Sequence, residues 1–171
     1  MIRKKKLFVR PKKLYQKGRI SEENALMEKY ALKNKKEIWK TLAKVNYFRS
    51  RAKILAKESD EEQKILFSKL SRLGLNVKGI ADVLALKIDD ILNRRLTSVI
   101  YNKKLSATPQ QARQLVAHKK VSINSKIINI PGYLVSVDEE SLISVILPPK
   151  RAAEPEESVS KEPVASEEGK K

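Results

Sequence analysis

The sequence contains no cysteine and only one histidine, His118, among its 171 residues. The absence of cysteine excludes disulfide bonds and thiolate metal sites, although it leaves the redox compartment undecided. A single histidine cannot form a histidine-based metal cluster, and the chain has no glycine-rich phosphate-binding loop. Because these absences leave no recognisable catalytic constellation, we expect no enzyme activity, no cofactor and no small-molecule substrate.

Long apolar runs are also missing. No run is long enough to cross a bilayer, and the N-terminus lacks the apolar stretch of a secretory signal. We therefore expect residence in the cytoplasm and no membrane partner.

Positive charge is in large excess. Lysine and arginine number 37 against 20 aspartate and glutamate residues, for a net charge of +17. Such a chain attracts polyanions, of which nucleic acid is favoured. The alternative, a membrane-surface protein, would require a basic helix with a continuous apolar face. Aromatic residues make up only 5%, which favours recognition of folded RNA by shape and backbone over stacking on single strands.

The two ends of the chain differ in composition from its middle. Residues 1–20 hold nine Lys or Arg and no acid, so we predict an arm that is disordered when free and binds nucleic acid, with a solvated tail as the alternative. Residues 151–171 are rich in Glu, Ser, Pro and Ala, and we predict a disordered acidic tail. From residue 152 on, six Glu stand against three Lys, which leaves a net charge of +20 on residues 1–151. The candidate contacts of the arm are Lys4, Lys5, Lys6, Lys12, Lys13 and Arg19.

Apolar residues at helical spacing predict a helical domain over residues 21–93. Ser21 is expected to cap a first helix that runs to about residue 34. The capping-box pattern of residues 60–63 (Asp-Glu-Glu-Gln) predicts the start of a third helix, which Gly74 would end. The second helix is predicted by one apolar stripe, which consists of Ile38, Leu42, Val45, Phe48, Ala52 and Leu55.

Two more helices are expected before residue 103. The run over residues 80–86 predicts a short helix of one or two turns. Asp89 or Asp90 would then begin a longer helix through Ile100, with its acids near the positive end of the helix dipole. This interpretation places Arg94 and Arg95 at adjacent positions of one helix.

Residues 94–150 predict a smaller domain with one more helix and a sheet. Thr108 can cap the helix, Pro109 suits its first position, and Gln111 can reach back to complete a capping box. Strands are predicted over residues 121–123, 126–130, 133–137 and 142–147. The first two strands would pair around a turn at Asn124-Ser125. We interpret the acids at 138–140 as a polar turn between strands, with a metal role as a remote alternative.

Cationic and amide side chains concentrate at the ends of the elements predicted for this domain. Arginine can bind phosphate through two parallel hydrogen bonds, lysine provides a point charge, and amides can bind 2′-hydroxyls or base edges. His118 stands among lysines, so we interpret it as a surface or RNA-contacting residue and not as a general base. A scattered, solvated surface is the alternative interpretation of the whole set. The candidate RNA contacts are Arg94, Arg95, Gln111, Arg113, Gln114, His118, Lys119, Lys120, Asn124 and Lys126.

Three segments, RRLTSVIY, TPQQARQLVAHKKVSIN and NIPGYLV, resemble the S-four RNA-binding domain. Upstream, KYALKNKKEIWK (residues 29–40) resembles the helical domain of archaeal and eukaryotic ribosomal protein S-four, a small-subunit protein. The resemblance extends over roughly residues 19–148, and the combination with the VDEESLI segment is more specific than the S-four domain alone.

The resemblance implies a primary binder of small-subunit ribosomal RNA, seated where several RNA helices meet. It also implies a place at the messenger-RNA entry channel beside a neighbouring small-subunit protein, an interface linked to decoding accuracy. Two positions depart from many archaeal members, which have glycine where this chain has Lys119 and Ser125, so the turn type at Ser125 stays open. The positions that match the RNA-facing side of the family are Arg95, Tyr101, Arg113, Gln114, His118 and Asn124, and Arg94, Lys119 and Lys120 extend that face.

Together these observations predict an α+β protein. Its N-terminal helical domain would be followed by a small helix–helix–β-hairpin RNA-binding domain, with a basic arm and an acidic tail at the ends. The predicted function is that of a structural constituent of the small ribosomal subunit that nucleates assembly of the subunit body. Two alternatives are an RNA-modifying enzyme that uses an S-four domain for targeting and a stand-alone S-four protein that binds stalled ribosomal particles.

Overall fold

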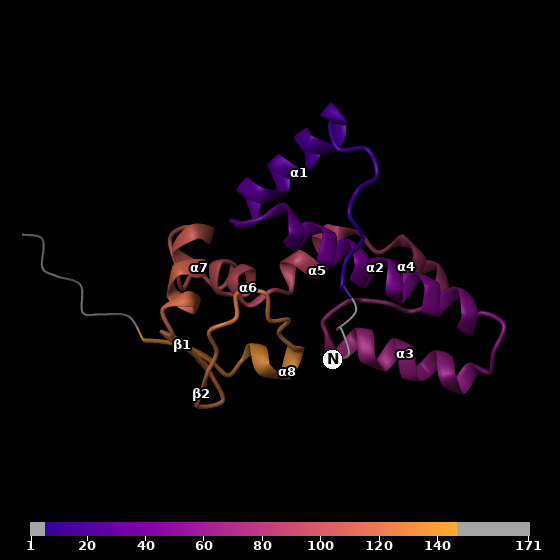
Figure 1. Ribbon diagram of the computed structural model, residues 1–171. Helices are drawn as coiled ribbons and strands as arrows, with labels where there is room; N and C mark the ends of the chain where they lie inside the picture. The colour runs from indigo at the N-terminus through magenta and orange to yellow at the C-terminus, as the bar shows by residue number, and fades with distance from the viewer. Residues whose placement is uncertain (1–5, 147–171) are drawn as a thin grey trace, which may run out of the picture.

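The computed structural model describes residues 6–146, which form eight helices and one three-stranded antiparallel sheet (Figure 1). This mixture confirms the predicted α+β class, while the predicted acidic tail lies outside the described residues. The helical part (residues 17–93) contains α1 (Lys17–Lys29), α2 (Lys35–Leu55), α3 (Asp60–Arg72), α4 (Ile80–Ala85) and α5 (Ile88–Asn93). The mixed part (residues 94–146) contains α6 (Leu96–Asn102), α7 (Pro109–Ala117), β1 (Val121–Ile123), β2 (Lys126–Ile127), α8 (Val137–Glu140) and β3 (Ile143–Val145).

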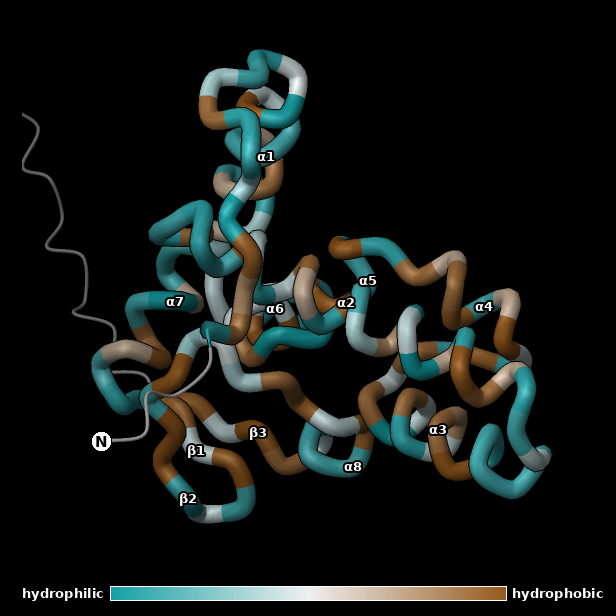
Figure 2. Tube along the Cα trace, turned by 45° about the vertical axis from the view of Figure 1, so that its right-hand side comes forward, coloured by the Kyte–Doolittle hydropathy of each residue, from teal (hydrophilic) through white to brown (hydrophobic). Residues whose placement is uncertain are grey.

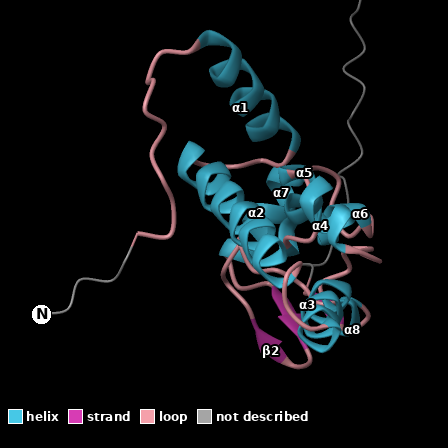
Figure 3. Cartoon of the chain, turned by 90° about the vertical axis from the view of Figure 1, so that its right-hand side faces the viewer, coloured by secondary structure: helices cyan, strands magenta, loops and turns pink. Residues whose placement is uncertain are grey.

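Helix α2 is the centre of the helical part, and α1, α3, α4 and α5 all pack against it (Figures 1 and 3). Most of its predicted apolar stripe is buried, because α3 and α4 cover its C-terminal half. Leu42 is the exception, since 39% of its surface is exposed, and its predicted place in the core is wrong. The buried cluster under α3 and α4 consists of Ala52, Leu55, Leu66, Leu70, Leu75, Val77, Val83 and Leu86.

Helix α1 begins and ends about four residues earlier than predicted. Its first turns are held by the ion pair between Arg19 and Glu23, four residues apart at 2.7 Å, and Ser21 is not the cap. The helix stops because Ala31 takes a left-handed φ of 47°, which turns the chain toward α2.

The end of α3 and its acidic first turn confirm the prediction, but the predicted capping box does not form. The N-cap is Ser59, which makes no side-chain cap hydrogen bond, and the Gln63 amide group donates to the Leu55 carbonyl at 3.0 Å. The helix begins at Asp60, and Gly74 has a φ of +73°, which only glycine adopts without cost. The amide of Leu75 donates to the Leu70 carbonyl at 3.0 Å, which closes the end of the helix.

The predicted long helix through Ile100 is wrong, because the chain breaks between α5 and α6. Arg95 is extended, with φ −71° and ψ 145°, and pairs with Leu134 in an isolated β-bridge. The Leu96 amide donates to the Tyr133 carbonyl at 2.8 Å, and the Val135 amide donates to the Arg94 carbonyl at 3.0 Å. A distant segment therefore takes hydrogen bonds that a continuous helix would have used. The acidic start of α5 is confirmed, since Asp90 accepts the amide of Lys87 at 2.7 Å.

The mixed part has its own apolar core beneath the sheet. Strand β1 lies in the middle of the order β2-β1-β3, and both neighbours are antiparallel to it. Strand β2 spans two residues, which is shorter than the predicted 126–130. The buried residues of this core are Leu96, Val99, Ile100, Ala112, Leu115, Val116, Val121, Ile123 and Val135.

Helix α7 begins as its sequence predicts, with one change. The Thr108 hydroxyl accepts the Gln111 amide at 3.2 Å, and Pro109 is the first helical residue. The Gln111 side chain does reach back, but it accepts the amide of Ala107 at 2.9 Å and not that of the cap residue. The helix start is therefore capped, although not by the capping box that we predicted.

The turn between β1 and β2 contains two residues in the left-handed region. Asn124 has a φ of 48° and Ser125 has a φ of 64°. Two successive positive φ values define a type I′ turn, which matches the right-handed twist of a hairpin. This finding answers the question that serine at position 125 left open.

The predicted strand over residues 133–137 is wrong, because Val137 begins helix α8. Ser136 caps the helix by accepting the Glu139 amide at 3.3 Å, and Glu139 accepts the Ser136 amide at 3.0 Å. The acids at 138–140 are thus the first turn of a helix and not a turn between strands, and Figure 2 shows them as a hydrophilic segment. Within residues 6–146, no group of three or more His, Cys, Asp or Glu residues could hold a metal ion. In the same range, no helix is long and apolar enough to span a membrane.

Candidate nucleic-acid interface

The corner between α7 and β1, together with the β1–β2 hairpin, presents exposed cationic and polar side chains. His118 and Lys119 are exposed at the end of α7, and Lys119 takes a left-handed φ of 59° that ends the helix. Asn124 and Lys126 are exposed at the hairpin, and Lys120 is half-buried between the two. The structure thus gathers five predicted contacts on one corner of the mixed part, which we call the α7–hairpin corner.

A groove of about 620 Å³ lies between α7 and the chain that joins α1 to α2. On the α7 side it is lined by Gln110, Arg113 and Gln114. Ala31, Lys33 and the acidic Glu28 line the opposite side. The groove therefore brings the amide and cationic groups of α7 together with one lysine and one carboxylate of the helical part.

Arg95 and Arg113 are engaged inside the protein, and both bind the carboxylate of Glu37. The Arg95 Nη2 atom lies 2.6 Å from Glu37 Oε2, and the Arg113 Nη2 atom lies 2.7 Å from Oε1. Only 5% of the Arg95 side chain is exposed, against 23% for Arg113. Burial by itself would raise the pKa of Glu37, but the hydrogen bonds and charges of the two arginines outweigh burial and hold that pKa below its ordinary value.

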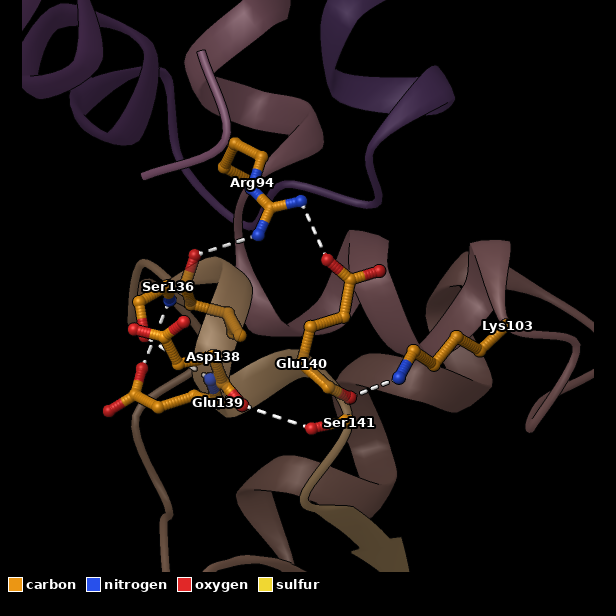
Figure 4. Close-up of polar contacts among 8 residues, drawn as sticks. Arg94, Lys103, Ser136, Asp138, Glu139, Glu140 and Ser141 are labelled. Atoms are coloured by element: carbon orange, nitrogen blue, oxygen red, sulfur yellow. Dashed lines mark hydrogen bonds and ion pairs between the residues drawn. The ribbon is translucent and has the colours of Figure 1, made fainter. Parts of the chain in front are cut away.

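Arg94 is also committed to contacts within the chain (Figure 4). Its guanidinium donates to Glu140 at 2.8 Å and to the Val135 carbonyl at 3.1 Å. Lys103 donates to the backbone carbonyl of Glu140, which ties the end of α6 to α8. The guanidinium also lies against Gly74 at the end of α3. Arg94 therefore joins the helical part to α8 instead of standing free on the surface.

The remaining predicted contacts are spread over the chain. Tyr101 is 42% exposed on α6, and Gln111 is exposed but caps α7. Arg19, which we predicted in the arm of residues 1–20, lies in α1, because that helix begins at Lys17. It binds Glu23 and donates to the Lys13 and Leu14 carbonyls at 2.9 Å each, so it holds the preceding arm residues against the helix. Lys6, Lys12 and Lys13 are exposed, while Lys4 and Lys5 lie outside the described residues.

Two acids that sequence reasoning missed, Glu23 and Glu37, organise these cations. Glu23 accepts the indole N–H of Trp39 at 2.9 Å in addition to Arg19, which joins α1 to α2. Burial raises the pKa of Glu23, but the Trp39 and Arg19 hydrogen bonds more than compensate and lower it overall. The available signal was a lone acid in the basic segment KNKKEIWK, which a search for cations passes over.

Comparison with known proteins gives a consistent result. A model of the family described as "S4 domain" matches residues 94–141, which include the α7–hairpin corner. The small ribosomal subunit protein uS4 of Methanosphaera stadtmanae is 39% identical to this chain over an alignment 171 positions long. The alignment covers 96% of this chain and 93% of that protein. The uS4 proteins of Methanocella arvoryzae and Methanococcus aeolicus are 39% and 42% identical, over 82% and 74% of this chain and 75% of each relative. The extent and level of this identity show that the chain belongs to the family of small ribosomal subunit protein uS4.

Proposed function

We propose that this protein is a structural component of the small ribosomal subunit, where it binds ribosomal RNA. The observation that carries the proposal is the identity to uS4 proteins over nearly the whole chain, together with the exposed cations that the S-four segment gathers. The role is one of binding and not of catalysis, and its place is the ribosome in the cytoplasm. Its partners are the small-subunit RNA and neighbouring small-subunit proteins.

The proposed RNA surface consists of the α7–hairpin corner and the adjoining groove. Lys119, Lys120 and Lys126 neutralise phosphates, which supplies affinity that falls as salt rises. Gln110 and Gln114 are placed to bind 2′-hydroxyls or base edges, as expected for recognition of folded RNA. The exposed lysines of the arm add further charge to this surface.

We leave Arg94 and Arg95 out of the proposed surface. Both the clustering of cations in the sequence and the resemblance predicted that they bind RNA, but their guanidinium groups already bind Glu140 and Glu37. If Arg95 bound RNA instead, the carboxylate of Glu37 would lose one of its two arginine partners. We therefore propose that Arg94 and Arg95 stabilise the protein beneath the RNA surface and do not contact the RNA.

The finer roles belong to the same proposal. A protein whose helical part and mixed part both present cations can clamp an RNA junction, and early binding there would nucleate assembly of the subunit body. The proposal also includes contact with the messenger-RNA entry channel and with a neighbouring small-subunit protein. That protein contact would influence decoding accuracy.

The test is binding of the purified chain to small-subunit ribosomal RNA across a salt series, with transfer RNA as competitor. Replacing Lys119, Lys120 and Lys126 by Gln should weaken binding and reduce the slope of log affinity against log salt by about 2 to 3. The matched control replaces three exposed lysines of the α3 region with Gln, namely Lys57, Lys64 and Lys69.

Equal losses in the two triple variants would refute the proposed surface. Binding of the wild-type chain that transfer RNA abolishes would refute specific recognition of ribosomal RNA. Co-sedimentation with mature small subunits separates a constitutive component from a stand-alone S-four protein, which would remain with stalled particles only.

A further inference from the structure

Glu37 is a single carboxylate that joins the helical part to two elements of the mixed part. It lies in the first turn of α2 and accepts from Arg95 at the start of α6 and from Arg113 on α7. The second Arg113 nitrogen, Nη1, lies 3.1 Å from Glu37 Oε2 and 3.2 Å from the Ala31 carbonyl. Both oxygens of Glu37 are therefore used, and each bond crosses between the two parts.

The charge of Glu37 opposes the general attraction of this chain for RNA. Its sequence neighbours Lys35, Lys36 and Lys40 are all cationic. Because the two arginines hold its pKa below the ordinary value, Glu37 is ionised at neutral pH and cancels part of the local positive charge. A chain selected only for net charge would be a better polycation without it, so its benefit must be geometric.

Apolar packing does little to fix the two parts relative to each other. The buried apolar clusters of residues 6–146 each lie wholly within one part, since one spans residues 96–135 and the others lie at or before Leu92. Glu37 and Arg113 stand beside the α7 groove and also line a second hollow of about 570 Å³. That hollow places Lys40 and Lys44 of α2 opposite the segment over residues 130–134.

We propose that Glu37 is a positioning residue that holds the two parts in the arrangement that recognises ribosomal RNA. It does not touch the RNA, and it acts by keeping Arg95 and Arg113 bound across the boundary between the parts. The inference rests on the proposed RNA-binding function and adds the residue that determines its specificity. Loss of the carboxylate should therefore weaken specific binding even though it makes the chain more cationic.

The experiment compares Glu37→Gln, Glu37→Asp and the exposed-acid control Glu61→Gln for affinity toward small-subunit ribosomal RNA and toward transfer RNA. If the competent arrangement falls to about a tenth of the population, Glu37→Gln should lower affinity for ribosomal RNA about tenfold. Its affinity for transfer RNA should stay unchanged or rise. Glu37→Asp keeps the charge but has a shorter side chain. It should lower the preference for ribosomal RNA over transfer RNA too, but by less than Glu37→Gln does. Glu61→Gln removes the same charge and should not lower the preference for ribosomal RNA.

A second variant and a second measurement separate positioning from mere loss of stability. Val83→Ala opens the core under α4 without touching the ion pairs, and it should destabilise the chain but preserve the preference. Small-angle X-ray scattering of the free chain should show a larger radius of gyration for Glu37→Gln than for Val83→Ala at a temperature where both variants are folded.

The outcomes distinguish the inference from the function on which it rests. Ribosomal-RNA binding by Glu37→Gln as tight as that of the wild type would overturn the inference. Tighter binding would overturn it too and would show that Glu37 competes with RNA for Arg113. An equal loss of preference in Val83→Ala would overturn it as well. If the wild-type chain shows no preference, the proposed function itself fails.

Discussion

Replacing Gly74 by alanine tests whether the end of α3 and the junction to α8 are built around the absence of a side chain. Gly74 has a φ of +73°, and a Cβ atom placed there would lie 2.8 Å from Cζ and 2.9 Å from Nε of Arg94. An arginine tip usually moves aside at little cost, but this one is held by Glu140 and by the Val135 carbonyl. The substitution therefore acts through both the backbone and the Arg94 contacts.

The expected cost is the sum of two contributions. A left-handed conformation costs alanine about 1 to 2 kcal/mol. Displacing Arg94, whose side chain is 17% exposed, forfeits hydrogen bonds worth about 1 to 2 kcal/mol. We expect Gly74→Ala to lower the free energy of unfolding by about 2 to 4 kcal/mol, as measured by urea denaturation with circular dichroism.

Gly79 provides the matched control, because no atom lies within 4 Å of the place where its Cβ would stand and its backbone is extended. Gly79 is the N-cap of α4, where glycine is preferred to alanine, so Gly79→Ala should cost no more than about 1 kcal/mol. In a chain that already carries Arg94→Ala, the cost of Gly74→Ala should fall to the conformational contribution of about 1 to 2 kcal/mol. Equal costs for Gly74→Ala and Gly79→Ala, or no coupling to Arg94, would refute this reasoning.

Two further predictions concern Glu37 and the hairpin turn. Because the pKa of Glu37 in the folded chain lies below its ordinary value of about 4.5, the stability that this carboxylate contributes is present above pH 4.5 and is lost as pH falls through the lower folded value. The stability difference between wild type and Glu37→Gln in urea should therefore shrink between neutral pH and acid below 4.5, and a constant difference would contradict an ionised Glu37. Ser125 has a φ of 64°, so Ser125→Gly should stabilise the type I′ turn by about 0.5 to 1 kcal/mol, whereas the same change at extended Ser136 should destabilise the chain. Thermal unfolding of the two serine variants checks the sign of each effect.

Elements with local signals were predicted well. Helix α7 begins at Thr108 and Pro109 because a cap and its helix lie within four residues of each other. Gly74 ends α3, and the apolar stripe of α2 faces the core apart from Leu42. These features depend on neighbours in sequence, so composition and spacing suffice to find them.

The wrong long helix over residues 88–100 has a different cause. The break between α5 and α6 depends on hydrogen bonds from residues 133–135, which are about forty positions away in the chain. Without those partners the acidic start and apolar spacing of residues 88–100 read as one helix. The wrong strand over residues 133–137 is a failure of another kind, because its signal is local. The capping pair of Ser136 and Glu139 spans four residues, but we followed the alternation of Tyr133, Val135 and Val137.

The candidate site divides along the same line. Composition and local pattern suffice to predict the excess of positive charge, the end of α7 and the hairpin where Lys119 and Lys126 lie, and the family to which they point. Which cations stay exposed depends on contacts that form only when the chain folds. Glu37 meets Arg95 across 58 positions and Arg113 across 76, and no local pattern encodes a contact of that range. The sequence does not indicate whether an arginine side chain faces solvent or a carboxylate. The fold therefore decides whether an arginine is available to RNA or stabilises the protein.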